Sequence, residues 1–435
     1  MKLIIDETTY TTLQNLSYAP QVDVTGSELP INTFKVDVIT TDTITDGVFA
    51  ELRDDRNRLY ANYYITKAER QAANVVRVYA ESPLALLDRI TLQAVMYSSK
   101  NAADAIDDCF TSLGPGFTVG IDYVVAQSLQ SATITGYCPE QTARERLQWI
   151  CFAIGAYVRT FKTTAVSIIP VDTTERLVPL EKTYFRPTQQ IGEWVTAIKI
   201  TSFAFSQAAS QADWENDDSS YIFPLPWVAT EQEITLTNNE APASAPGNVV
   251  EISEMYLVNS GNVSAIASRL AAIHFKRGTV QLEAINNGDY WPGEKLIVYT
   301  DKQSMVAGTL MSETFAFGKQ AKATMNVRVS ETKTAATLVI NYKYGDDKLD
   351  DAQYLLPVGY TYEIENPYLD IPSGGHRYIY RPQNTAATGT MSSGTNTNNQ
   401  PFDIALDAEN MNLKIISVDD ITVQSSGNIA VGVIA

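Results

Sequence analysis

The chain has 435 residues, 45% of them hydrophobic, and a formal net charge of −18. This length exceeds one ordinary hydrophobic core, so the scaling of surface with volume predicts roughly two to four domains. So acidic a surface repels phosphate backbones and anionic lipids, which argues against specific nucleic-acid binding and against membrane association. The first residues, MKLIIDETTYTTL, contain no long apolar run and have an acid at Asp6, so we expect no signal peptide and folding in a cytoplasm.

The first third of the sequence favours strands. Phe34, Val36 and Val38 fall on one face of NTFKVDVIT, as a half-buried strand requires. The segment GVFAELRDDRNRLYANYYITKAERQAANVVRVYA then predicts a meander of three strands. Turn-forming residues between the first two of these strands are Asp54, Asp55 and Asn57.

Two helices are expected next. The first lies in ESPLALLDRITLQAVMYSS, with Ser82 as N-cap, Pro83 at the first helical position and apolar spacing that continues to Val95. A second short helix, from Ala102 to Phe110, is closed by the glycine-rich turn at 114–116.

The segment CPEQTARERLQWICFAIGAYVRTF, at 138–161, suggests an active site because it holds two cysteines and a tryptophan. Its pattern instead favours architecture. Thr142 and Glu145 form a capping box, an apolar stripe of period near 3.6 follows, and Gly155 suits a left-handed C-terminal cap. A hairpin with its turn at 162–164 comes directly afterwards. We therefore expect Trp149 and Cys151 on a helix packed against a sheet.

The remaining sequence returns to strands. EWVTAIKITSFAF precedes an acidic loop at 213–220, and the helix expected in NVSAIASRLAAIHFKRG is ended by Gly278. Strand patterns follow in TVQLEAI, EKLIVYT, SMVAGTLMSETFAF and KATMNVRVS. Segments 52–78 and 297–329 share a weak repeat of strand, turn, strand, turn and closing strand, which would give one chain two copies of a similar β domain.

The residue types of common active sites are sparse. Cys109, Cys138 and Cys151 are an odd number without CxxC spacing, which favours buried thiols over disulfides. The two histidines, His274 and His376, lie about a hundred residues apart and cannot build a His-rich zinc site, and no GxSxG motif accompanies them. We interpret His274 as a partly buried helix residue and His376 as a loop residue.

Two loops resemble ligand sites only superficially. The acidic loop offers oxygen ligands but lacks the glycine and final glutamate of an EF-hand, so a solvated loop is favoured and cation binding stays open; its acidic and amide residues are Asp213, Glu215, Asn216, Asp217 and Asp218. GPGFTVG, at 114–120, has a misplaced third glycine and follows a helix where a phosphate-binding loop follows a strand. We predict no catalytic, cofactor-binding or metal-binding residues and no cofactor.

Two blocks occur in tandem: ELRDDRNRLYANYYITKAER…NVVRVYAESPLALLDR and YCPEQTARERLQWICFAIGAYVRTF…VSIIPV. SRLAAIHFKRGTVQLEAI and PGEKLIVYTDKQSMVAGTLMSETFAFG follow. In order and spacing, the segment from Ile31 to Arg328 resembles the baseplate hub proteins of contractile phage tails and of phage-tail-like bacteriocins from Gram-positive bacteria.

The resemblance implies a structural protein, not an enzyme. It implies a homotrimeric ring in the virion tail baseplate, assembled in the host bacterial cytoplasm, that adapts a hexameric tail tube to a trimeric central spike. Each subunit would supply two tube-like β domains, and an acidic channel wall would let DNA or ions pass. Implied partners are the tube or tube-initiator protein, the spike, the tape measure protein and other baseplate proteins. Whether the particle is an infectious phage or a bacteriocin stays open.

We therefore expect a mainly β, multidomain protein, α+β overall, with two tail-tube-like β-barrel domains, a small helix-plus-hairpin insertion and a C-terminal β extension. The expected boundaries are 1–81 completed by 171–205 for the first barrel, 82–170 for the insertion, 206–344 for the second barrel, and 345–435 for the extension with a flexible loop at 385–400.

Two alternative functions stay open. A tail-associated cell-wall hydrolase could draw a carboxylate pair from the 50 acidic residues, although no motif marks one. A β-rich receptor- or carbohydrate-binding module could use the aromatic tail, although tyrosines between Pro and Gly favour packing of a small β domain. These tyrosines are Tyr360, Tyr362, Tyr368, Tyr378 and Tyr380.

Overall fold

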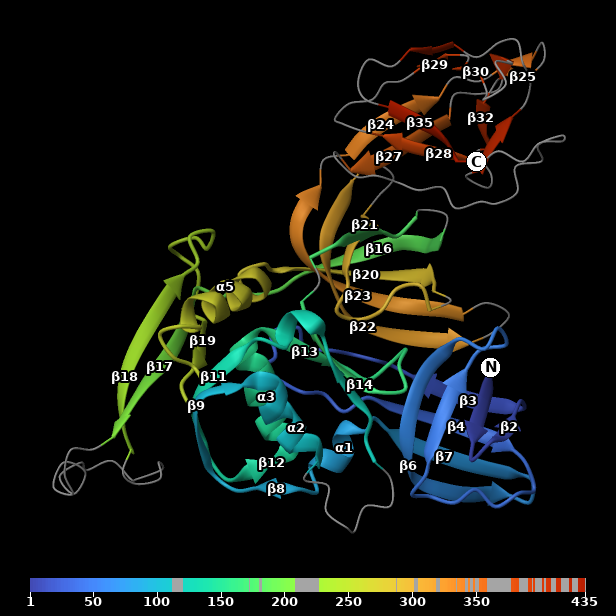
Figure 1. The fold of residues 1–435 in the computed structure, drawn as a ribbon. Coiled ribbons are helices and arrows are strands. Elements are labelled where there is room, and N and C mark those ends of the chain that lie inside the picture. The colour runs from blue at the N-terminus through green and yellow to red at the C-terminus, as the bar shows by residue number, and fades with distance from the viewer. Residues whose placement is uncertain are drawn as a thin grey trace. The chain divides into compact units, whose positions relative to one another are not determined.

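Figure 1 shows the computed structural model of the chain. The structure describes residues 1–111, 120–171, 173–179, 182–207, 227–286, 288–300, 304–317 and 321–333, and after these the strands assigned between 335 and 434. Two compact units are present, one of Met1–Leu296 with Gly308–Ser330 and one of Ile297–Ala307 with Glu331–Ala435. Strands in several sheets dominate, which confirms the expected mainly β, multidomain class.

The largest sheet contains 13 strands, and its main path runs β16–β20–β23–β22–β3–β4–β7–β6–β5–β1–β2. This path has two ends, so the pairings between the described strands do not close a barrel. The bounds of its strands, with the short β15 and β21, are β1 (Lys2–Ile5), β2 (Thr8–Tyr10), β3 (Leu13–Tyr18), β4 (Thr33–Ile39), β5 (Phe49–Arg53), β6 (Leu59–Ala72), β7 (Val75–Glu81), β15 (Glu175–Leu177), β16 (Thr183–Ile191), β20 (Gly278–Ile285), β21 (Lys295–Tyr299), β22 (Met305–Phe317) and β23 (Ala321–Lys333).

Strands β1 to β7 form the first β region, and their sequences explain their pairing. Phe34, Val36 and Val38 are buried on one face of β4, as the alternation predicts. In the turn between β5 and β6, the Asp54 carboxylate accepts hydrogen bonds from the N–H groups of Arg56 and Arg58, and Asn57 takes a φ of 65°. The three expected strands β5, β6 and β7 are confirmed as an antiparallel meander.

The second β region, β16 with β20, β22 and β23, joins the first through β3. Tyr18 of β3 pairs with Phe315 of β22, and the chain after β3 continues antiparallel to β22 through the bridge between Gln21 and Ser312. The Glu313 N–H donates to the Pro20 carbonyl at 3.0 Å. Two β regions of one chain therefore share one continuous sheet.

The insertion between the β regions mixes short helices and strands. Its elements are α1 (Leu84–Leu87), β8 (Thr91–Leu92), β9 (Val95–Asn101), α2 (Ala102–Thr111), β10 (Tyr123–Val125), the 3-10 helix η1 (Gln127–Leu129), β11 (Thr133–Cys138), β12 (Gln141–Thr142), α3 (Ala143–Ile154), β13 (Ala156–Arg159) and β14 (Val166–Pro170). The second expected helix is confirmed as α2, and the expected hairpin as β13 with β14. The glycine-rich turn at 114–116 lies outside the described residues.

The first expected helix is wrong beyond Leu87. Thr91 pairs with Thr142 and Val95 pairs with Cys138, so strand pairing with a later part of the chain replaces the helix. Ser82 is not its N-cap, because Pro83 occupies that position and the Ser82 hydroxyl accepts from the Asn32 N–H instead. Tertiary contacts override the local helical spacing here.

Helix α3 confirms the capping signals. The Thr142 hydroxyl accepts from the Glu145 N–H, the Glu145 carboxylate accepts from the Thr142 N–H, and Gly155 ends the helix in the left-handed conformation with φ 74°. Leu147, Ile150 and other apolar residues of α3 are buried in a core shared with α1, α2, β9, β11, β13 and β14.

A separate three-stranded sheet, here named the β17 sheet, has the order β18–β17–β19. Its elements, with the helix that packs on it, are β17 (Ala197–Gln207), β18 (Trp227–Thr237), β19 (Val249–Ile252) and α5 (Val263–His274). Val263, Ile266 and Leu270 of α5 bury the predicted apolar face in a shared core. The helix ends at His274 and Gly278 begins β20, so the expected end at Gly278 is wrong. The acidic loop at 213–220 lies outside the described residues.

The second unit contains short paired strands. β24 pairs with β27, β25 with β26, β28 with β35, β29 with β34, β30 with β31, and β32 with β33. Their bounds are β24 (Ala335–Ile340), β25 (Lys343–Tyr344), β26 (Asp347–Lys348), β27 (Ala352–Pro357), β28 (Arg377–Pro382), β29 (Thr390–Ser392), β30 (Gly394–Thr395), β31 (Pro401–Phe402), β32 (Ile404–Asp407), β33 (Asn412–Ile415), β34 (Thr422–Gln424) and β35 (Ile429–Ile434).

Candidate functional site

The three cysteines lie in the core of the insertion. All three are buried free thiols, and burial raises the pKa of Cys138 and of Cys151 to about 12. A thiol becomes a nucleophile only as its thiolate, so these side chains are inert at neutral pH. The Trp149 ring packs edge-on against Tyr256, with ring centroids 5.7 Å apart. These contacts support a structural role for the segment at 138–161.

His274 lies at the C-terminal end of α5, where it is half-buried. Burial lowers its pKa, Asp23 partly opposes this shift, and Arg328 adds to it. Its imidazole is therefore neutral at neutral pH, as a packed helix residue would be. His376 and the five tail tyrosines have no described side chains, so the predictions for them stay untested.

Metal-binding and membrane-spanning features are absent from the described part of the chain. Within it, no three side chains of His, Cys, Asp or Glu gather closely enough to hold a metal ion. Within the same residues, no helix has the length and apolarity that crossing a bilayer requires.

One cluster of aromatic side chains joins three distant parts of the chain, and we name it the aromatic junction. It consists of Tyr18 and Tyr60 from the first β region, Phe161 from the turn after β13, Trp291 from the loop after β20, and Phe315 and Phe317 from β22. Trp291 lies at its centre, 1% exposed, and stacks on Phe161 with ring centroids 5.5 Å apart. Tyr60 contacts Trp291 at 5.6 Å and Phe315 at 5.3 Å.

Aromatic pairs with these tilted and offset geometries contribute about 0.5 to 1.5 kcal/mol each beyond the burial of their area. Tyr18 adds a stacked contact with Phe315 at 5.6 Å, and Phe317 an edge contact with Tyr60 at 5.4 Å. Because each part of the chain supplies at least one ring, the junction fixes the insertion and both β regions against one another.

Backbone hydrogen bonds lock the tip of the β13–β14 hairpin into the junction. Lys162 donates its N–H to the Tyr60 carbonyl at 3.0 Å, and Phe161 forms a bridge with Ala61. The Tyr18 hydroxyl donates to the same Tyr60 carbonyl at 2.8 Å. The Lys162 ammonium lies 5.5 Å from the centre of the Trp291 ring, and burial lowers its pKa.

Ion pairs surround the junction. The Arg176 guanidinium donates to the Glu294 carboxylate at 2.7 Å and to the Asp289 carbonyl at 2.8 Å. Lys182 pairs with the Asp289 carboxylate at 3.3 Å. Burial raises the pKa of Glu294 although Arg176 opposes this shift. These contacts hold the loop that carries Trp291.

Asn286 and Glu313 form a buried polar pair beside the junction. The Asn286 side-chain carbonyl accepts from the N–H groups of Gly288, Asp289 and Tyr290, which shapes the loop. The Asn286 amide donates to Oε1 of Glu313 at 2.5 Å, while Oε2 of Glu313 is buried without a partner. Burial raises the pKa of Glu313 far above its ordinary value, which favours the protonated carboxyl.

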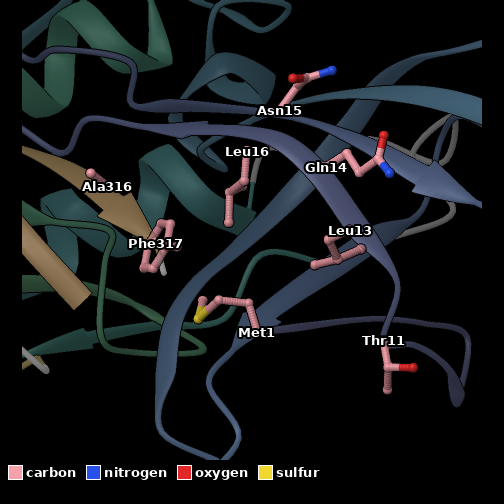
Figure 2. A pocket seen from close by; sticks show the side chains of 8 residues that line it. All are labelled: Met1, Thr11, Leu13, Gln14, Asn15, Leu16, Ala316 and Phe317. Carbon is pink, nitrogen blue, oxygen red and sulfur yellow. The ribbon is translucent and has the colours of Figure 1, made fainter. Parts of the chain in front are cut away.

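Figure 2 shows a pocket that residues of β3 and β22 line in part, among them Phe317 of the junction. Its volume is about 450 Å³. Neutral side chains line it, and Met1 contributes its thioether while its ammonium pairs with Asp55. The lining residues are Met1, Thr11, Leu13, Gln14, Asn15, Leu16, Ala316 and Phe317. None of these side chains supplies an acid, a base or an activated nucleophile.

The sequence interpretation did not find the junction. A usable local signal was present in NNGDYWPGE, where turn-forming residues enclose an aromatic pair. The partners of Trp291 lie too far away in the sequence for any periodicity to connect them.

Comparison with known proteins gives similarity of fold. No protein-family model and no curated protein sequence matches the chain. A tail protein from Neisseria meningitidis MC58 matches with a TM-score of 0.51 and 10% identity, over 75% of this chain and 95% of that protein. The 43 kDa tail protein of prophage MuSo2 from Shewanella oneidensis matches with a TM-score of 0.50 and 9% identity, over 75% and 97%. Over three quarters of its length the chain therefore has the fold of phage tail proteins.

Proposed function

We propose that the chain is the structural baseplate hub of a contractile phage-type tail. Three copies form a ring that adapts a hexameric tail tube to a trimeric central spike and lines the channel between them. The observation that carries this proposal is the fold shared with two phage tail proteins over 75% of the chain. The proposed location is the tail baseplate of a virion or a bacteriocin particle.

The internal architecture suits such an adapter. A subunit that bridges sixfold and threefold symmetry needs two similar surfaces held at a fixed spacing. Two β regions of this chain share one sheet, and the aromatic junction holds them together. Because closely packed interiors transmit strain and resist deformation, the junction would keep that spacing constant.

Charge supports a channel-lining role. The chain has 50 acidic and 32 basic residues, and a negative wall keeps passing DNA from adhering. We propose that the tube or tube-initiator protein, the spike, the tape measure protein and other baseplate proteins are its partners, and that it acts without catalysis. The proposed domains are 1–81 completed by 171–205, then 82–170, 206–344 and 345–435.

Mass measurement tests the proposal. Light scattering of the purified chain across a concentration series, repeated with the candidate spike protein, should give a trimer in at least one condition. Negative-stain images of that peak should show threefold rings with a central hole. A monomer at every concentration, indifferent to the spike, would contradict the proposal. Peptidoglycan release and cell adsorption would then test the hydrolase and receptor-binding alternatives.

A further inference from the structure

Strand β18 has one edge that no strand in the described part of the chain pairs with. Among the described strands it pairs with β17 alone, in unbroken register from Gln207 and Trp227 to Ala197 and Thr237. No proline and no bulge interrupts its 11 residues. Figure 1 shows β17 lying between β18 and β19. Proteins usually shorten, bend or cover an edge of this length, because its free N–H and C=O groups are a template for another strand.

The register identifies which backbone groups point outward. Phe203 of β17 lies opposite Glu231, yet its N–H donates to the Val258 carbonyl, away from β18. This pair is therefore the non-hydrogen-bonded kind, in which both residues turn their backbone groups away from each other. By alternation, the odd-numbered residues of β18, including Glu233 and Thr235, also direct their N–H and C=O groups to the open edge.

The side chains of these odd-numbered residues share an acidic face of the β17 sheet. Glu231 and Glu233 are exposed there, and Glu251 of β19 lies on the same face. Lys199 of β17 lies on this face too, and its ammonium pairs with the Glu233 carboxylate at 3.6 Å. This face therefore carries an excess of negative charge along the strand that has the open edge.

The opposite face of β18 is apolar towards the C-terminal end of the strand, after the exposed Thr230 and Gln232. Ile234 and Leu236 are partly buried against the core that α5 covers, together with Ile198 and Ile200 of β17. A strand added beside β18 would extend this core with its own apolar side chains. Its other side chains would lie beside Glu231 and Glu233.

We propose that the β18 edge binds an extended segment of another protein in which basic residues alternate with apolar ones. Its backbone would pair with the outward groups of Glu231, Glu233 and Thr235, and its basic residues would lie beside the two carboxylates. A second copy of β18 fits poorly, because a symmetric antiparallel pair centred on Gln232 would place Glu231 opposite Glu233. The inference does not depend on the trimeric ring.

Titration with a designed peptide tests the inference. The probe is a capped, fluorescent peptide of nine alternating lysine and valine residues, added to the full chain and followed by anisotropy. We expect saturable binding that weakens with salt, and loss of binding for a peptide of the same composition with lysines and valines in separate blocks. Methylating one alternate set of backbone nitrogens should abolish binding, while methylating the other set should spare it, because a docked strand turns only one set towards β18.

Variants of β18 separate backbone pairing from general attraction to an acidic protein. Thr235→Pro removes an outward N–H without changing charge or the pairing with β17, so it should weaken binding about tenfold or more. The double variant Glu231→Gln, Glu233→Gln should weaken binding by a similar factor and flatten its salt dependence. Glu28→Gln, which neutralises an exposed acid elsewhere, should bind as the parent does. If Thr235→Pro binds the peptide as tightly as the parent, with unchanged circular dichroism, the inference is wrong. It is also wrong if Glu28→Gln weakens binding as much as the double variant does.

Discussion

The aromatic junction and the β17 sheet use strands in opposite ways. The junction collects rings from three distant parts of the chain around Trp291, and all of these rings except Phe317 are buried. The β17 sheet buries one face under α5, and its other face carries the exposed Glu231 and Glu233 beside the buried Phe203. Among the described strands, one edge of this sheet has no partner. The junction is therefore a buried contact between distant segments, and the β17 sheet keeps surface available for contacts.

The sharpest way to break this contrast is to remove the central ring. Trp291→Ala should destabilise the chain by about 3 to 5 kcal/mol, because a fully buried aromatic side chain leaves a cavity. Urea unfolding followed by circular dichroism measures the loss. The matched control is Trp194→Ala, whose ring is partly exposed beside Arg277 and should cost about 1 kcal/mol. Equal losses for the two variants would contradict the contrast.

The buried carboxyl of Glu313 gives the junction a pH dependence. The folded-state pKa of Glu313 is raised above the ordinary 4.5. Its stabilising contribution to the unfolding free energy is therefore fully present below pH 4.5 and is lost as the pH rises towards the folded-state pKa. We expect the unfolding free energy of Glu313→Gln to increase relative to that of the parent as the pH rises. The difference should grow by at most about 1.4 kcal/mol per pH unit. Unfolding measured at a series of pH values above 4.5 tests the slope.

Glu251→Gln is the control for that slope, because this acid lies exposed on the β17 sheet. Its pH profile should run parallel to that of the parent. A Glu313→Gln profile that also runs parallel to the parent would show that Glu313 is ionised in the folded chain.

A smaller effect is expected at the start of α3. Thr142→Ala removes the hydroxyl that accepts from the Glu145 N–H, which should cost about 1 kcal/mol. Thr142→Ser keeps the hydroxyl and should keep most of the stability. Thermal unfolding compares the two variants, and equal losses would argue against the cap.

The smallest effect is expected on the exposed face of the β17 sheet. Lys199→Gln breaks the ion pair with Glu233, which is partly exposed, so the unfolding free energy should change by less than about 1 kcal/mol. A loss as large as that of Trp291→Ala would mean that this face is structural instead of available for binding. The same urea titration gives the answer.

Local features of the fold could be predicted from the sequence where their causes lie within a few residues. The Thr142–Glu145 capping box, the alternation in β4 and the turn at Asp54 to Asn57 are examples. The helix expected up to Val95 failed because Thr91 and Val95 pair with strands some forty to fifty residues later, and local spacing carries no information about such partners.

The candidate site could not be predicted for the same reason. The local sequence around Tyr60, Phe161 and Trp291 indicates only ordinary buried aromatic residues. The fold alone brings these three rings together. Glu313 lies on the same face of β22 as the buried Phe315, while Thr314 on the other face is exposed. An acidic residue in such an alternating strand is expected on the exposed face, so the pattern did not indicate its burial.

The central claim is that one chain supplies two linked β regions to a threefold ring. Image reconstruction of the purified assembly, with the spike protein if trimers require it, tests this claim most directly. We predict three chains around a central channel, with six β regions arranged about it and the aromatic junction intact in each chain. A twofold dimer, or a ring in which only one β region of each chain faces the channel, would contradict it.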